Sequence, residues 1–126
     1  MLKIEPKSDT PGIVIDAEQN IFEIYGKSLP EDANDFFAPV INEFKAYCLN
    51  PNEQTVLTIN LEYYNSASVR QLINILTILE DLHKKHGNVK VIWLYEDNDE
   101  NMKDNGEEFQ DTVDIPFEIK SFHFDI

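Results

Sequence analysis

The chain has 126 residues, 42% of them hydrophobic, and its 24 Asp and Glu against 10 Lys and Arg leave a formal net charge of −14 at pH 7. This length and composition predict one packed domain spanning residues 1–126 and argue against a disordered chain. The negative charge argues against nucleic acid and anionic membranes as direct partners, because both repel an acidic surface.

The N-terminal half begins with a segment that has little regular pattern. Residues 1–11 are expected to form a partly extended N-terminal tail, without the apolar stretch of a signal peptide. Residues 13–15 and 21–25 predict two short strands joined as a hairpin. No apolar stretch in the sequence is long enough for a membrane span.

A first helix follows the hairpin. We expect it to start after Asp32, because a later start keeps Pro39 near the first turn, where proline is tolerated. An alternative start at Ser28 rests on its capping-box spacing with Glu31. Five apolar residues at helical spacing predict the buried stripe of this helix: Phe36, Phe37, Val40, Ile41 and Phe44.

A second unit of strand and helix is the clearest in the chain. Residues 55–63 are rich in β-branched and apolar side chains and predict a third strand. At residues 65–68 the apolar period changes from two to 3.6, which predicts a long helix. That helix is expected to end at Gly87, after cationic residues that suit a helix C-terminus.

The C-terminal part continues the alternation. Residues 89–95 are apolar on both faces, which is typical of a strand buried within a largely parallel sheet. Residues 96–114 carry a net charge of −8 and predict an acidic loop with a helix around 102–113, and residues 117–124 predict a last strand. The expected fold class is α/β, in the order β-β-α-β-α-β-α-β, with helices packed on a mostly parallel sheet.

The sequence offers no clear catalytic or metal-binding site. The phosphate-loop, dinucleotide, nucleophile-elbow and zinc-protease motifs are absent from the sequence, so no catalytic residue and no cofactor are assigned. The single cysteine, Cys48, is expected to be a packing residue, and one cysteine favours a reducing, cytoplasmic location. His83 and His86 have helical spacing, but two ligands do not make a metal site.

The acidic segment has partial calcium-loop spacing. Between Asp97 and Glu108, oxygen side chains stand at positions one, three, five and twelve of such a loop, yet position six is Met102 where glycine is required. A calcium-binding module, a solvated acidic face and a docking surface for a basic partner therefore all stay open.

The strongest local signal is Asn65-Ser66-Ala67-Ser68, between a strand and a long helix. One of the serines is expected to cap the helix. Alternatively, a serine at this junction is phosphorylated, because free backbone N–H groups and the positive end of the helix dipole tolerate a phosphate there.

Three segments together resemble the SiaC family of bacterial regulatory phosphoproteins. They are the junction 65–68 after Leu61-Glu62-Tyr63-Tyr64, the motif from Gly26 to Ala33, and the acidic run from Asp97 to Glu108 ahead of Ile115-Pro116-Phe117. The resemblance covers nearly the whole chain. It implies a STAS-like fold, similar to that of anti-sigma-factor antagonists.

The resemblance also implies partner switching. A family member is phosphorylated by a dedicated protein kinase and dephosphorylated by a PP2C-type phosphatase, and in some bacteria its unphosphorylated form binds a diguanylate cyclase of cyclic-di-GMP signalling and biofilm formation. The position of the family's acceptor threonine corresponds to Ser66, with Ser68 as second choice, while Ala67 replaces a residue that usually carries a hydroxyl. Asn65, Ser66, Ser68 and Arg70 are the expected partner-binding residues. The alternatives are a constitutive adaptor that is not phosphorylated and the calcium-binding module.

Overall fold

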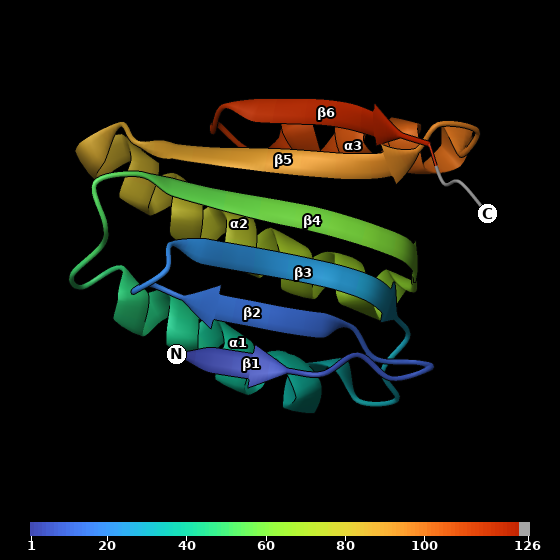
Figure 1. Cartoon of the computed structure of the whole chain (residues 1–126), viewed down its shortest axis with the longest axis horizontal. Coiled ribbons are helices and arrows are strands. Elements are labelled where there is room, and N and C mark those ends of the chain that lie inside the picture. Colours follow the sequence, from blue (N-terminus) through green and yellow to red (C-terminus); the bar gives the residue numbers. More distant parts are fainter. Residues whose placement is uncertain (124–126) are drawn as a thin grey trace.

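One mixed sheet organises the chain in the computed structural model, which describes residues 1–123 (Figure 1). Its elements in chain order are β1 (Leu2–Ile4), β2 (Gly12–Asp16), β3 (Ile21–Ser28), α1 (Ala33–Tyr47), β4 (Thr55–Tyr64), α2 (Ser66–His86), β5 (Val89–Glu96), α3 (Glu100–Thr112) and β6 (Phe117–Phe122). The α/β fold class with a mostly parallel sheet is confirmed. Within residues 1–123, none of the helices is both long enough and apolar enough to cross a membrane.

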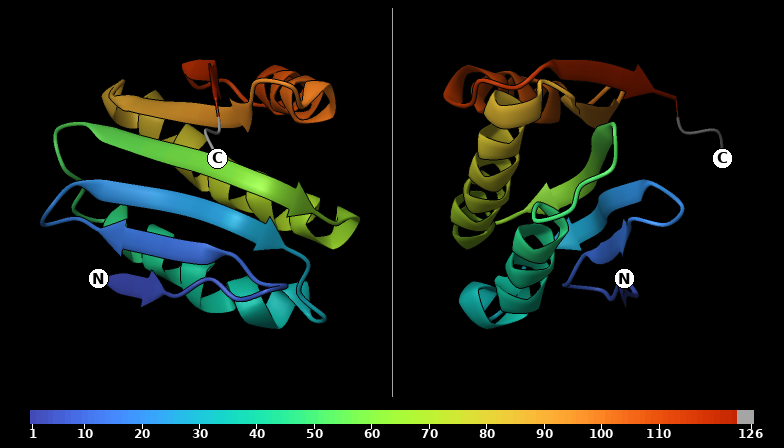
Figure 2. Two further views of the ribbon diagram at one scale, coloured as in Figure 1. Left: turned by 45° about the vertical axis from the view of Figure 1, so that its right-hand side comes forward. Right: turned by 90° about the vertical axis from the view of Figure 1, so that its left-hand side faces the viewer.

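The strand order across the sheet repeats the order along the chain, β1-β2-β3-β4-β5-β6. The first three strands pair antiparallel, and β3 to β6 pair parallel. Each parallel crossover therefore steps to the next strand in the same direction. Because such crossovers are right-handed, all the helices come to lie on one face of the sheet (Figure 2). The opposite face, which we name the open sheet face, has no helix over it.

The ends of the chain differ from the sequence prediction. Residues 2–4, expected within an extended tail, form the edge strand β1, in which Leu2 lies opposite Ile15 of β2. This strand is only three residues long, so its sequence shows too little alternation of apolar and polar side chains to predict a strand. It depends on pairing with β2. The helix α3 begins at Glu100, two residues before the predicted start. The last strand ends at Phe122, and the predicted Phe124 lies outside the described residues.

The start of α1 matches the preferred prediction. Asp32 is the N-cap, and its carboxylate accepts a hydrogen bond from the Asp35 N–H at 3.0 Å. Pro39 lies one turn deeper than expected, inside α1 but on its exposed side. The alternative start at Ser28 is wrong, because this residue ends β3 and is fully buried.

The core lies between the sheet and the helices and is mainly aliphatic, with several large aromatic side chains. Its largest fully buried side chains are Trp93, Phe22, Phe37 and Phe44. The Trp93 indole fits against α3, where its Nε1 donates a hydrogen bond to the Met102 carbonyl at 3.0 Å. A Cβ placed on Gly106 of the same helix would come within 2.5 Å of the indole Cδ1. Gly106 is therefore required for the close approach of α3 to the sheet.

We expect Gly106→Ala to lower the free energy of unfolding by about 1–3 kcal/mol, because the added methyl group overpacks a rigid site. The better helix propensity of alanine, about 1 kcal/mol, offsets part of this loss. Urea denaturation measures the change. Glu107→Ala, at the neighbouring exposed position, is the matched control and should not destabilise the protein. Equal stability of Gly106→Ala and the wild type would show that the indole can move aside.

Candidate functional site at the start of α2

The helix α2 is capped by an amide side chain. Asn65 has extended backbone angles (φ −98°, ψ 172°), and its Oδ1 accepts hydrogen bonds from the Ser68 N–H at 3.0 Å and the Ser68 hydroxyl at 2.9 Å. Asparagine is as good an N-cap as serine. The prediction that a serine caps this helix is therefore wrong, and the Ser66 hydroxyl is not needed for capping.

Ser68 belongs to the interior of the protein. It is 0% exposed, its Oγ lies 2.7 Å from the Ser28 Oγ, and it also lies 2.9 Å from the Ser28 carbonyl oxygen. The Asn65 N–H donates to the same carbonyl at 3.1 Å. These bonds join the end of β3 to the start of α2. Ser68 is therefore not part of an exposed surface in this conformation, which contradicts its expected place on the partner-facing surface.

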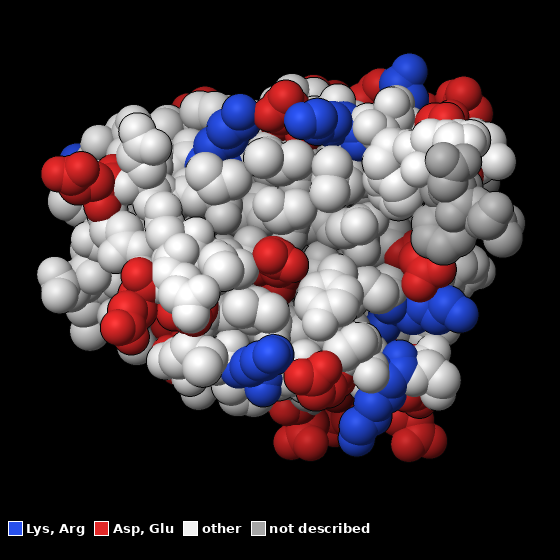
Figure 3. Space-filling model, in the orientation of Figure 1, with Lys and Arg blue, Asp and Glu red and all other residues white. Residues whose placement is uncertain are grey.

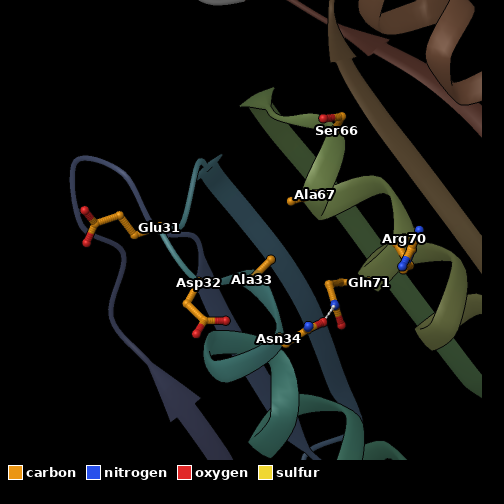
Figure 4. Close-up of a pocket in the computed structure, with 8 residues that line it drawn as sticks. All are labelled: Glu31, Asp32, Ala33, Asn34, Ser66, Ala67, Arg70 and Gln71. Carbon is orange, nitrogen blue, oxygen red and sulfur yellow. Dashed lines mark hydrogen bonds between the residues drawn. The ribbon is translucent and has the colours of Figure 1, made fainter.

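Ser66 has the opposite environment. It is the first residue of α2 and is exposed, and its hydroxyl has no hydrogen-bond partner among the described residues. The side chain borders an open cleft of about 570 Å³ between the start of α1 and the start of α2 (Figure 4). Of the two serines at the junction, only Ser66 is accessible to another protein.

The walls of the cleft carry opposite charges. Exposed Arg70 lies one helical turn after Ser66 on α2, while Glu31 and Asp32 lie on the α1 side. The two walls meet where the Gln71 amide donates a hydrogen bond to Asn34 Oδ1 at 2.6 Å. Gln71 is only 3% exposed, so this bond fixes the spacing of the two helices at the base of the cleft.

The strand that leads into the site has a bulge. The register between β3 and β4 shifts after Gly26, so Lys27 lies opposite Tyr63 and not Glu62. The extra residue leaves the Tyr63 side chain 62% exposed, while Tyr64 contacts the rings of Trp93 and Phe109. Burial, with a smaller contribution from the Glu108 carboxylate, raises the pKa of Tyr64 to about 12. The bulge thus packs Tyr64, the last residue before the junction, against the core.

Two of the segments that carried the family resemblance meet in this cleft. The segment from Gly26 to Ala33 supplies buried Ser28 and cleft-lining Glu31, and the segment 65–68 supplies the start of α2. They are far apart in sequence but adjacent in the fold. A comparison with protein families matches residues 4–122 to the family described as "SiaC family regulatory phosphoprotein".

The chain belongs to the SiaC family.

SiaC itself is among the solved structures that this chain resembles. In the crystal structure of the diguanylate cyclase SiaD in complex with its activator SiaC from Pseudomonas aeruginosa, a chain that is 27% identical superposes with a TM-score of 0.91, covering 97% of this chain and 100% of that one. Apo-SiaC from the same organism is 28% identical with a TM-score of 0.86, covering 94% and 97%. The uncharacterized protein PA14_02130 of P. aeruginosa (strain UCBPP-PA14) is 28% identical over 95% of both chains.

The remaining nucleophile and histidine candidates have structural roles in this SiaC-family chain. Cys48 is the C-cap of α1, where burial raises the pKa of its thiol against the opposing effect of Lys85. A raised pKa means less thiolate and a weaker nucleophile. The Nδ1 of His83 accepts a hydrogen bond from the Val89 N–H at 3.1 Å, which joins the end of α2 to β5.

The acidic segment does not form a calcium loop. From Glu100 onward it is helical, so side chains that would have to converge on one ion are spread along α3. Asp99 is occupied as the N-cap of α3, where its Oδ1 accepts a hydrogen bond from the Met102 N–H at 3.1 Å. Within residues 1–123, no three His, Cys, Asp or Glu side chains are grouped to hold a metal ion. This geometry argues against the calcium-binding alternative.

Proposed function

We propose that this chain is a regulatory phosphoprotein without catalytic activity of its own, and that its switch is a phosphate on Ser66. The observation that carries the proposal is the contrast between the two serines at the start of α2. Ser66 is exposed beside a cleft, whereas Ser68 is fully buried and hydrogen-bonded. A protein kinase reaches the first without any change of structure and the second only after the helix opens.

The family supplies the partners of the switch. A protein kinase adds the phosphate, a PP2C-type phosphatase removes it, and all three proteins meet in the cytoplasm. The unphosphorylated form binds an effector, for which a diguanylate cyclase is the best candidate, because SiaC of P. aeruginosa is the activator of such an enzyme and forms a complex with it. Through the cyclase, the switch would control cyclic-di-GMP signalling and biofilm behaviour.

The cleft gives the phosphate a physical effect. Phosphorylation adds about −1.5 to −2 charges at pH 7. At Ser66 these charges face Glu31 and Asp32 across the cleft, with Arg70 as the nearby cation. The phosphate would pair with Arg70 and leave the rest of the rim negative. A partner that binds Arg70 would therefore lose that cation, and a partner that binds the uncharged start of α2 would meet a negative charge there. The domain itself would stay folded.

Binding of the effector tests this function. We expect Ser66→Asp to weaken binding to the diguanylate cyclase of the source organism by about tenfold, because the new carboxylate competes with the effector for Arg70 and adds a negative charge to a rim that already carries Glu31 and Asp32. Calorimetry or surface plasmon resonance measures the constant. An acidic residue in the first turn stabilises a helix, so unfolding would not explain the loss.

Asn74→Asp is the matched control, since it adds the same charge at an exposed position two turns further along α2. Its affinity should equal that of the wild type. If Ser66→Asp also binds with wild-type affinity, charge at this position does not select the partner. If wild-type protein does not bind the cyclase, the effector belongs to another class.

A further inference from the structure

The open sheet face is a continuous surface on the side of the sheet away from the helices. The strand registers place one residue of each strand in a row across it: Lys3, Val14, Glu23, Thr58, Ile92 and Glu118. These residues alternate along their strands with side chains buried under the helices, such as Ile13, Phe22 and Val91. The face therefore spans all the strands from β1 to β6.

The strand β5, next to the edge strand β6, is apolar toward this face as well. Val91 and Trp93 are buried under the helices, whereas Ile92 and Leu94 are half-buried on the opposite side. The sequence predicted burial of this strand on both faces, and the fold of the single chain covers only one. Parallel sheets are covered by helices on both faces as a rule. The outward-facing apolar side chains of β5 therefore lack the covering layer of helices that is usual for such a strand.

The open sheet face is nearly neutral on a strongly acidic molecule. Four lysines lie on it, Lys3, Lys27, Lys90 and Lys120, and five carboxylates, Asp16, Glu23, Glu62, Glu96 and Glu118. Their net charge is −1, against −14 for the whole chain. Figure 3 shows this face, with charged side chains at its periphery and an acidic group within the uncharged central area. Another protein can approach here with little repulsion.

Glu23 is the exception within the central area. It is half-buried between Ile21 and Tyr25 along β3, and beside Val14 and Thr58 on the neighbouring strands. It has no ion pair among the described residues. The nearby lysines are already paired, Lys3 with Glu5 at 3.7 Å and Lys90 with Glu118 at 2.8 Å. Covering the Glu23 carboxylate costs several kcal/mol unless the covering layer brings a cation.

We infer that the open sheet face binds a helix of the effector protein, whose apolar side packs on Ile92 and Leu94 and whose Lys or Arg pairs with Glu23. The inference rests on the proposed function, because it names a further surface that holds the same effector, in addition to the start of α2. A second copy of this chain fits less well: it would bring another −14, and two of the four lysines on its own face are already in ion pairs.

Binding to the diguanylate cyclase of the source organism provides the test, with full-length protein and two substitutions on the face. We expect Glu23→Lys to weaken binding by about tenfold or more, since it sets a cation against a cation. Ile92→Thr keeps a β-branched side chain and is expected to weaken binding several-fold through lost apolar contact. Glu107→Lys, the same charge change on exposed α3, should bind like the wild type. Circular dichroism of each variant confirms that it is folded.

The outcomes separate this inference from the proposed function. If the wild type binds the cyclase and both face variants bind equally well, the open sheet face is not the docking surface, and the role of Ser66 is untouched. If the wild type does not bind, both proposals for the cyclase fail together. Sedimentation velocity tests the remaining possibility, that the open sheet face binds a second copy of this chain. A dimer that Glu23→Lys or Ile92→Thr converts to a monomer, with unchanged cyclase binding, would assign the face to a second copy and overturn the inference.

Discussion

Incubation with the cognate kinase and Mg-ATP is expected to add one phosphate to the wild-type protein and none to Ser66→Ala. The reason is access: Ser66 is exposed at the first turn of α2, whereas the Ser68 hydroxyl is fully buried with hydrogen bonds to Asn65 and Ser28. Intact-mass analysis measures the uptake, and peptide mapping locates the phosphate. The effect is complete loss, the largest that we expect for any single substitution.

A second exposed serine offers the control for this experiment. Ser8 precedes β2 in an exposed turn, and Ser8→Ala should take up phosphate like the wild type. Phosphate that persists in Ser66→Ala, or that maps to Ser68, would refute Ser66 as the acceptor. A protein that is never phosphorylated, either by the kinase or in its native cells, would favour the constitutive adaptor.

Ser68→Ala is expected to lower the free energy of unfolding by roughly 2–3 kcal/mol. The substitution removes the partner of the Ser28 hydroxyl, which lies 2.7 Å away and is itself 0% exposed. A buried polar group without a partner costs about 1–3 kcal/mol, and the lost bond to the Asn65 cap adds to this. Urea denaturation measures the change, and Ser66→Ala at the exposed neighbour should stay within about 0.5 kcal/mol of the wild type.

A double-mutant cycle separates the buried pair from its surroundings. Because Ser28 and Ser68 share one hydrogen bond, Ser28→Ala should cost much less in the Ser68→Ala background than in the wild type. The expected coupling energy is about 1 kcal/mol. Additive effects would mean that each serine is held independently by its other contacts, and that the junction between β3 and α2 does not depend on this bond.

The parts of the fold that depend on local pattern could be predicted from the sequence. The start of α1 after Asp32 and the end of α2 at Gly87 follow from capping chemistry, and Gly87 indeed has the left-handed φ of +69°. The strands and helices follow from their apolar periods. The strand β1 was missed, because three residues carry too little pattern and their pairing with β2 is non-local.

The environment of each serine could not be predicted. Asparagine and serine cap helices equally well, so the motif could not say which of Asn65, Ser66 or Ser68 takes that role. The burial of Ser68 depends on Ser28, which is distant in sequence and whose spacing with Glu31 is that of a helix cap. Likewise, the apolar sequence of β5 predicts that both faces of this strand are covered. It does not show whether the second covering layer comes from the same chain or from a partner.

The agreement between strand order and chain order has a consequence for how the domain forms. Every pair of adjacent strands is also consecutive along the chain, so each new strand docks onto one that is already in place. Only a single hairpin or helical crossover has to close at each step, which keeps the entropy of loop closure small. During synthesis, the sheet can grow from β1 toward β6 as the chain leaves the ribosome, without waiting for its C-terminal end.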